Sequence, residues 1–190
     1  MVKPIRFPIQ PASNTLGFIL LLAMALFPAL PSAQTMSRTE KLESKLRVAI
    51  IKATKGLKAP LIKAADLKQI IDDTNLVLID VRKSNEQEVS MLPHALTTAG
   101  FAETFRHGIP KEKRLVVYCT IGYRSGKYAE ELAKQGFKAE NLEGGVLAWS
   151  FAGGKLFTKN SVGEVVETNR IHVYDPEWNI VHPDYVGVVQ

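Results

Sequence analysis

The sequence has one cysteine, Cys119, among its 190 residues. A single cysteine excludes an internal disulfide, a four-cysteine zinc site and a dithiol redox pair, because each of these needs a second sulfur atom. The excess of one sign of charge is also small: the sequence has 24 basic and 19 acidic residues, which gives a formal net charge of +5. This balance does not predict a nucleic-acid-binding protein. The hydrophobic share of 46% is sufficient for one sizeable core.

No uncharged apolar run reaches the roughly 20 residues that a membrane-spanning helix needs. The longest run, residues 16–27, follows Lys3 and Arg6 and precedes a stretch of small residues and prolines at 28–33. This order is typical of a secretory signal peptide. We therefore expect an exported, periplasmic protein, which residues 1–33 would anchor in a membrane if the signal is not cleaved.

Residues 34–57 are expected to form a linker that contains an amphipathic helix at 38–55. Ser37 and Glu40 have the spacing of a capping box, and apolar residues then recur at helical intervals until Gly56. The sequence therefore predicts that the helix begins directly after Ser37.

The polar side of this helix carries Lys41, Lys45 and Lys52. Two interpretations follow: the helix docks on the domain with a solvated lysine face, or the lysines bind an anionic membrane surface. Val48 and Ile51 widen the apolar face, and this width favours docking on the domain.

Short apolar runs alternate with helical periodicity from residue 58 to residue 154. Strands are expected at 61–63, 76–79, 95–96, 115–118 and 139–142, and helical segments at 64–73, 86–89, 101–107, 125–135 and 146–151. Apolar strands that alternate with helices indicate a parallel sheet covered on both faces. The predicted fold class is therefore α/β.

Residues 155–190 predict a loop-rich C-terminal extension. One strand is expected there, at 171–174, and Trp178 and Tyr185 are expected to pack back on the domain.

Cys119 directly follows the strand expected at 115–118 and precedes the next helix. In an open parallel sheet, ligands bind beyond the carboxyl ends of the strands, where this loop lies. Gly122 permits the backbone angles of a tight turn, while the free amides, the helix amino terminus and Arg124 favour negative charge. We therefore expect Cys119 to act as a thiolate or to carry an anionic adduct, rather than to be a buried apolar side chain.

Four motifs in this order carry a family resemblance: LIDVR at 78–82, VVYCTIGYRS at 116–125, LEGG at 142–145 and AW at 148–149. Together they make residues 58–154 resemble the rhodanese (sulfurtransferase) domain. The resemblance implies a parallel sheet covered on both faces and Cys119 as a nucleophile that carries a persulfide. It also implies a six-residue loop, from Cys119 to Arg124, whose amides surround that persulfide, and no metal or organic cofactor.

The resemblance also implies roles for other residues. Asp80 is expected to hold the end of its strand, Arg82 to attract an anionic donor, and Trp149 to lie in the core. Gly144 and Gly145 are expected at positions where two backbone segments approach closely. The implied substrate-binding set is Thr120, Ile121, Gly122, Tyr123, Arg124, Ser125 and Arg82.

Residues 90–95 depart from the family pattern. They read Ser-Met-Leu-Pro-His-Ala, where the family usually has Gly-His-Ile-Pro-Gly-Ala, so two glycines are lost. We expect a changed loop conformation there, with His94 at the surface or at the rim of the site. His107, His172 and His182 lack metal-ligand spacing, so no metal site is predicted.

The reaction that the resemblance implies moves a sulfur atom from a donor such as thiosulfate to a thiol or to cyanide. Because Arg124 is the loop's one cation, the expected thiosulfate activity is moderate, and a less charged donor or a protein persulfide also fits. One alternative is a phosphatase or arsenate reductase, but those loops resemble Cys-x5-Arg and this loop has four intervening residues. Another is a non-catalytic binding module with the same fold. A thiol-disulfide oxidoreductase is disfavoured, because no second cysteine can resolve a mixed disulfide.

Overall fold

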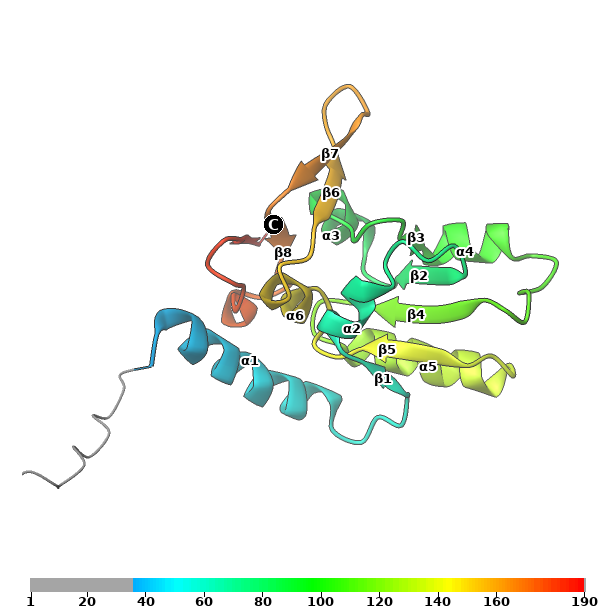
Figure 1. Ribbon diagram of the computed structural model, residues 1–190, viewed down its shortest axis with the longest axis horizontal. Helices are drawn as coiled ribbons and strands as arrows, with labels where there is room; N and C mark the ends of the chain where they lie inside the picture. Colours follow the sequence, from blue (N-terminus) through cyan, green and yellow to red (C-terminus); the bar gives the residue numbers. More distant parts are fainter. Residues whose placement is uncertain (1–35, 190) are drawn as a thin grey trace, which may run out of the picture. The chain divides into compact units, whose positions relative to one another are not determined.

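A five-stranded parallel sheet lies at the centre of the computed structural model, which describes residues 36–189 (Figure 1). The predicted export segment, residues 1–33, lies outside the described residues. The strand order is β1-β5-β4-β2-β3, and the strands are β1 (Leu61–Ile62), β2 (Leu76–Asp80), β3 (Leu96–Thr97), β4 (Arg114–Tyr118) and β5 (Ala139–Leu142). The central strand β4 is therefore the one that leads to Cys119.

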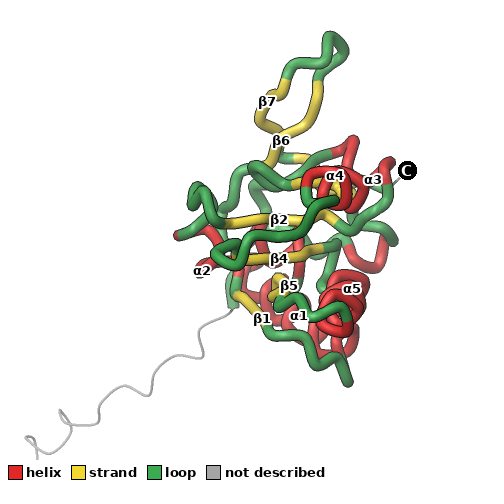
Figure 2. Tube along the Cα trace, turned by 90° about the vertical axis from the view of Figure 1, so that its right-hand side faces the viewer, coloured by secondary structure: helices red, strands yellow, loops and turns green. Residues whose placement is uncertain are grey.

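Helices cover both faces of this sheet (Figures 1 and 2). They are α1 (Arg38–Thr54), α2 (Ala64–Gln69), α3 (Ser84–Val89), α4 (Thr98–Thr104), α5 (Tyr123–Lys134) and α6 (Gly145–Phe151). Successive side chains of a strand point to opposite faces. Val116 and Tyr118 therefore pack with residues of α1, α2 and α6, whereas Leu115 and Val117 pack with residues of α4 and α5. This arrangement confirms the predicted α/β fold class.

Helix α1 begins after Ser37, and the capping box of Ser37 and Glu40 is present. Leu46 is buried on the domain. The expectation that Val48 and Ile51 help to dock the helix is wrong, because these side chains are 65% and 71% exposed. The helical angle of about 100° per residue turns both away from the face centred on Leu46. No helix among residues 36–189 is both long enough and apolar enough to cross a membrane.

The C-terminal extension contains more regular structure than the single strand predicted at 171–174. Its strands are β6 (Leu156–Lys159), β7 (Val165–Thr168), β8 (Arg170–His172) and β9 (Val186–Val188). Strands β6 and β7 form an antiparallel hairpin, and β8 pairs with β9 in parallel. Most of β7 is exposed, so the hairpin strands do not need to alternate between apolar and polar residues. This alternation is the pattern from which a strand is predicted, and the sequence therefore provides little indication of the hairpin. Trp178 and Tyr185 pack against the core, as predicted.

The loop at residues 90–95, for which the sequence predicts a changed conformation, contains one residue with a positive φ. His94 adopts the left-handed conformation with φ of 59°, at the position where the family pattern has its second glycine. Its side chain is exposed, as expected, and contacts the Asp72 carboxylate at 3.3 Å. The loop is fixed on its inner side, where the Leu92 amide donates to the Tyr118 hydroxyl at 3.1 Å.

Candidate active site

Cys119 lies at the carboxyl end of β4, between the ends of β2 and β5. The chain turns directly from this strand into α5, and Gly122 is the residue that caps the helix. Gly122 has a φ of 96°, in the left-handed region that glycine adopts without a steric penalty. The sharp turn keeps Cys119 close to the amino terminus of a twelve-residue helix.

One backbone amide of the loop points at the sulfur atom. The Gly122 amide donates to Cys119 Sγ at a donor–acceptor distance of 3.2 Å. Three more amides begin α5, those of Tyr123, Arg124 and Ser125, and the first amides of a helix have no acceptor within the helix. The amino terminus of α5 therefore places partial positive charge beside the sulfur.

The carbonyl groups of the loop are bound elsewhere, and this fixes which way its amides point. The Cys119 carbonyl accepts from the Val146 amide at 2.9 Å, and the Thr120 carbonyl accepts from the Leu147 amide at 3.2 Å. The Gly122 carbonyl accepts from Asn141 Nδ2 at 2.8 Å. Helix α6 and strand β5 thus hold three peptide units of the loop in fixed orientations.

Gly145 allows α6 to approach the loop this closely. Its φ is 55°, and a Cβ atom at this position would overlap the carbonyl oxygens of Cys119 and Thr120. Gly144, with φ of 73°, lies instead against the side chains of Ile50 and Ala148. The predicted close approach of two backbone segments is therefore present at Gly145, whereas Gly144 approaches side chains.

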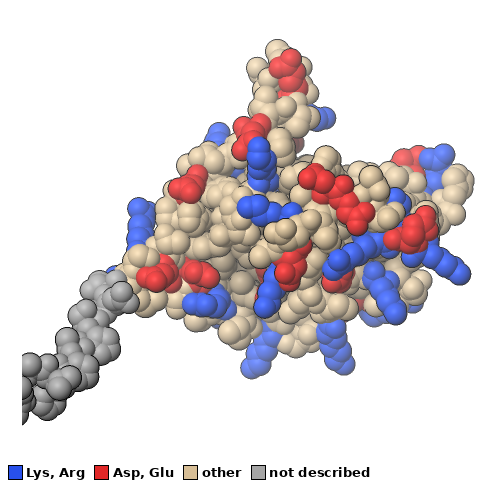
Figure 3. All heavy atoms as spheres, in the orientation of Figure 1, with Lys and Arg blue, Asp and Glu red and all other residues tan. Residues whose placement is uncertain are grey.

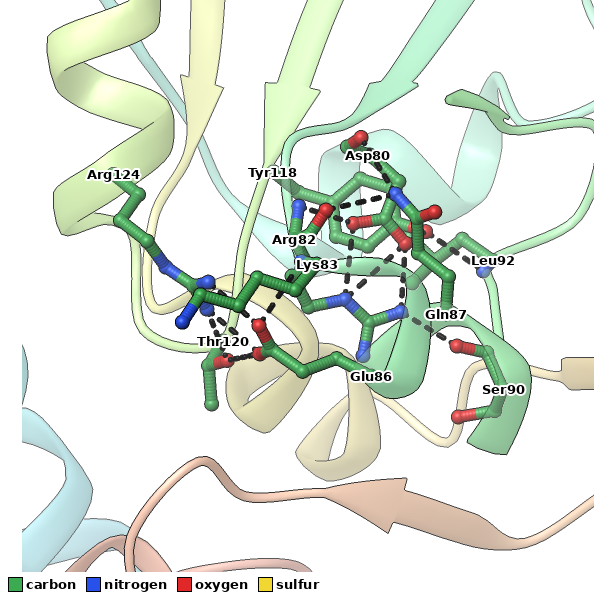
Figure 4. A network of polar contacts seen from close by, with 10 residues as sticks. All are labelled: Asp80, Arg82, Lys83, Glu86, Gln87, Ser90, Leu92, Tyr118, Thr120 and Arg124. Atoms are coloured by element: carbon green, nitrogen blue, oxygen red, sulfur yellow. Dashed lines mark hydrogen bonds and ion pairs between the residues drawn. The ribbon is translucent and has the colours of Figure 1, made fainter. Parts of the chain in front are cut away.

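A buried carboxylate, Glu86 of α3, binds both Thr120 and Arg124 (Figure 4). These two residues belong to the six-residue loop from Cys119 to Arg124, which we call the active loop. Glu86 accepts from both terminal nitrogens of Arg124, at 2.6 and 2.7 Å. It also accepts from the Thr120 hydroxyl at 3.0 Å and from the Lys83 amide at 3.1 Å. Burial on its own would raise the pKa of Glu86, but the hydrogen bonds from Arg124 and Lys83 outweigh it and lower the pKa to about 2.

A second buried ion pair lies beside the first. Arg82 donates to the Asp80 carboxylate through Nε at 3.0 Å and through Nη2 at 2.7 Å, and its Nη2 also reaches the Ser90 carbonyl at 2.5 Å (Figure 4). Burial opposes the charge on Arg82, but the Asp80 carboxylate outweighs it and raises the pKa of the guanidinium. The Tyr118 hydroxyl donates to Asp80 at 2.6 Å, and burial followed by this carboxylate raises the pKa of Tyr118 well above its usual value.

This geometry places Asp80 where the sequence predicted it, at the end of its strand, and pairs it with Arg82. Arg82, which was expected to attract an anionic donor, has no exposed side-chain surface. Its guanidinium is committed to Asp80 and Ser90, so it does not reach solvent at an entrance to the site. The two arginines of the site are thus each paired with a carboxylate.

Cys119 is itself buried, with 1% of its surface exposed. The expectation that this residue would not be a buried side chain therefore needs correction, although the predicted inward amide of Gly122 is present. The neighbouring loop residue Ile121 is buried too, in one core cluster with Ile171 and Val173 of the C-terminal extension.

Two flanking segments contact the loop and its surroundings. The Tyr174 ring lies over the Arg124 guanidinium, with 5.1 Å from Cζ to the ring centroid. On the other side, Thr54 and Ile50 of α1 lie against the backbone of Gly122 and Gly144. We call the segment 170–189 and helix α1 together the cover of the active loop.

The structure brings most of the predicted site residues to this loop. Thr120 and Ser125 are buried with bonded hydroxyls, the latter donating to Asn141 Oδ1 at 2.6 Å, and Tyr123 is 47% exposed. The sequence analysis missed Glu86 and Asn141. Asn141 had a signal, a polar residue inside a short buried strand, whereas Glu86 resembled any acidic residue in the first turn of a helix.

The comparison with protein families agrees with this geometry. Residues 63–152 match the family model of the rhodanese-like domain. This part of the chain is a rhodanese-like domain. Within it lie Cys119, Glu86 and both arginines of the site, whereas α1 and the C-terminal extension lie outside the matched residues. The cover is thus an addition to the rhodanese-like domain.

Known proteins resemble this chain over part of its length. A tRNA uridine(34) hydroxylase from Salmonella newport is 35% identical over 99 residues, which are 47% of this chain and 28% of that protein. The chain thus spans little more than a quarter of that relative. A solved thiosulfate sulfurtransferase from Pseudomonas aeruginosa is 20% identical with a TM-score of 0.47, covering 60% of this chain and 23% of that one. A solved rhodanese-like domain protein from Staphylococcus aureus is 27% identical with a TM-score of 0.41, covering 47% of this chain and 90% of that one.

The close approach at Gly145 predicts a large loss of stability in Gly145→Ala. Gly163→Ala is the matched control, because Gly163 has a φ of 85° with no atom within 4 Å of an added Cβ. Both variants bear the cost of a left-handed residue, but only Gly145→Ala also forces α6 off the loop. We expect its free energy of unfolding, measured in urea, to fall by about 1–3 kcal/mol more than that of Gly163→Ala. Equal losses would contradict the close approach.

The lowered pKa of Glu86 predicts acid sensitivity. The folded protein holds this carboxylate ionised down to about pH 2, whereas the unfolded chain takes up the proton near pH 4.5. The stabilisation is complete above pH 4.5 and is lost as the pH falls towards 2. At about 1.4 kcal/mol per pKa unit it amounts to about 3 kcal/mol.

Glu86→Gln should therefore be less stable at neutral pH and should lose less stability than the wild type between pH 4.5 and 2, measured by urea unfolding. Glu131→Gln, which removes an exposed partner of Lys134 on α5, is the control and should change stability by no more than about 1 kcal/mol. Parallel pH profiles for Glu86→Gln and the wild type would show that Glu86 carries no such charge.

Proposed function

We propose that this protein is a sulfurtransferase whose Cys119 carries sulfur as a persulfide. The observation that supports this most is the hydrogen bond from the Gly122 amide to Cys119 Sγ, in a loop whose carbonyls are bound elsewhere. Such a loop stabilises a negatively charged sulfur without first having to reorganise. The rhodanese-like domain is consistent with this chemistry.

The proposed reaction has two displacement steps. The Cys119 thiolate attacks the outer sulfur of the donor, the donor's sulfur–sulfur bond breaks, and its electron pair leaves with the donor, as sulfite if the donor is thiosulfate. A thiolate acceptor or cyanide then attacks the outer sulfur of the persulfide and releases the Cys119 thiolate. The amides of the loop would stabilise the negative charge on Sγ in the thiolate state and on the outer sulfur in the persulfide state.

The charges around the loop favour a weakly charged donor. Arg124 is bound at both terminal nitrogens by Glu86, and Arg82 is bound by Asp80. Each cation is therefore neutralised by a carboxylate, and a dianion such as thiosulfate meets little net positive charge. A persulfide of a small thiol or of a protein is the donor class that this balance supports.

Such a donor has to reach Cys119, which is buried. Because only 1% of Cys119 is exposed, we propose that part of the cover moves to admit the donor. The Tyr174 ring is half exposed and is held by its contact with Arg124, so segment 170–189 is the part of the cover that we propose opens. We also propose, from the sequence of residues 1–33 alone, that the protein acts after export.

The burial of Cys119 favours one competing function, a binding module that uses the fold without catalysis. The two functions differ in a single measurement. In a sulfurtransferase, incubation with thiosulfate or with cysteine persulfide, which carries less net charge, adds one sulfur atom to Cys119, and cyanide or a thiol removes it.

We expect intact-mass analysis of the purified chain to show this gain, faster with the persulfide than with thiosulfate, and to show none for Cys119→Ser. Thiocyanate release in the presence of cyanide should follow the same order. Absence of any gain on the wild-type chain with both donors would support the binding module. Release of phosphate from an aryl phosphate without thiocyanate formation would instead support a phosphatase.

The cover predicts that Cys119 becomes more reactive when the ring of residue 174 is removed. A partly exposed cation–π contact contributes about 1 kcal/mol, so its loss should raise the population of the open state about fivefold. We expect iodoacetamide to label Cys119 about fivefold faster in Tyr174→Ala than in the wild type.

Tyr174→Phe, which keeps the ring over Arg124, is the matched control and should react at the wild-type rate. If Tyr174→Ala also reacts at the wild-type rate, segment 170–189 does not control access.

A further inference from the structure

One side of α1 presents lysines and an exposed apolar residue together. At about 100° per residue, Lys41, Lys45, Val48 and Lys52 fall within about 60° of one another around the helix axis. All four are exposed, and neither Lys45 nor Lys52 forms an ion pair with any residue in the described range 36–189. Figure 3 shows Lys and Arg side chains projecting from the lower edge of the molecule, along which α1 runs in Figure 1. We call these four residues the lysine face.

An apolar groove adjoins the lysine face. It has a volume of about 620 Å³ and runs between α1 and the segment after β8. Its walls are Val48, Ala49 and Ala53 on one side and Trp178 and Ile180 on the other, and Lys45 and Lys52 belong to its lining. Ser44 and Glu177 complete the lining, so the groove has two cations and one acidic residue.

These features select a ligand with an apolar part and a negative charge. A nucleic acid would match the lysines but would leave the apolar groove unfilled, because its backbone is charged throughout. An anionic phospholipid matches both: its headgroup meets the lysines, and acyl chains or the bilayer interface meet Val48 and the groove. Tryptophan is also a side chain that favours the membrane interface.

In the sequence, α1 follows shortly after a segment with membrane character. Ten residues, 28–37, separate the uncharged apolar run at 16–27 from Arg38, the first residue of α1. Ten residues span at most about 35 Å. Where the apolar run enters a bilayer, the lysine face is therefore within reach of the surface of that bilayer.

We propose that the lysine face and the adjoining groove dock the protein on an anionic lipid bilayer, with Trp178 at the interface. This surface is separate from the Cys119 chemistry, so Cys119→Ser leaves the docking intact. Basic side chains near such a surface each contribute about fivefold to binding.

The test uses the full chain and vesicles of brominated phosphatidylcholine, with or without phosphatidylglycerol. Bromine quenches a tryptophan that lies at the interface, and Trp149 is buried in the core, with 1% of its surface exposed. We expect quenching with phosphatidylglycerol vesicles only, weakened by added salt, and its loss in Trp178→Phe. The double variant Lys45→Gln/Lys52→Gln should shift the docking equilibrium about 25-fold towards the undocked state.

The matched control is Lys111→Gln/Lys138→Gln, which removes the same charge from exposed positions before β4 and β5. It should quench like the wild type. Quenching that is equal with uncharged vesicles, equal in both double variants or retained in Trp178→Phe overturns the proposal. Vesicle binding with Trp178 unquenched also overturns it, because residues 1–35 would then hold the chain without the lysine face.

Discussion

The active loop depends on one buried carboxylate. Glu86 binds Thr120 and Arg124, the second and the last residues of the loop, and is itself held by the Lys83 amide. A buried charge is tolerated only when its partners replace water, and this one has four donors. The ion pair between Glu86 and Arg124 fixes the loop, and it also neutralises the charge of Arg124, the one cation in the loop. The rigidity of the site and its weak attraction for anions thus have the same cause.

A second constraint comes from what lies over the loop. The rhodanese-like domain supplies the sheet, Cys119 and the glycines, whereas α1 and segment 170–189 lie outside the matched residues and supply the cover. Burial places Cys119 in a medium where the Gly122 amide acts more strongly than it would in water. The same burial makes opening of the cover part of the proposed reaction. The proposed lipid surface is built from the same two additions, since the groove lies between α1 and the segment around Trp178.

Most of the sheet could be predicted, because its strands are short runs of β-branched and other apolar residues next to clear helical segments. The strand 139–142 was predicted with its observed bounds, and the other strands differ by one or two residues. Helix ends were less certain: α2 stops at Gln69 rather than at residue 73, and α5 begins at Tyr123 because Gly122 makes the turn. The extension was underpredicted, since exposed strands such as β7 lack the alternation that burial imposes.

The sequence by itself determined the place of Cys119 after its strand, the order of the motifs and the turn at Gly122, because these depend on residues adjacent in the chain. Only the tertiary structure decided the state of each charge and the access to the sulfur. Arg124 meets its carboxylate 38 positions away, at Glu86, and Ile121 belongs to one core cluster with Ile171 of the extension. Contacts between such distant positions depend on how helices and strands pack, and this packing cannot be predicted from the local periodicity of the sequence.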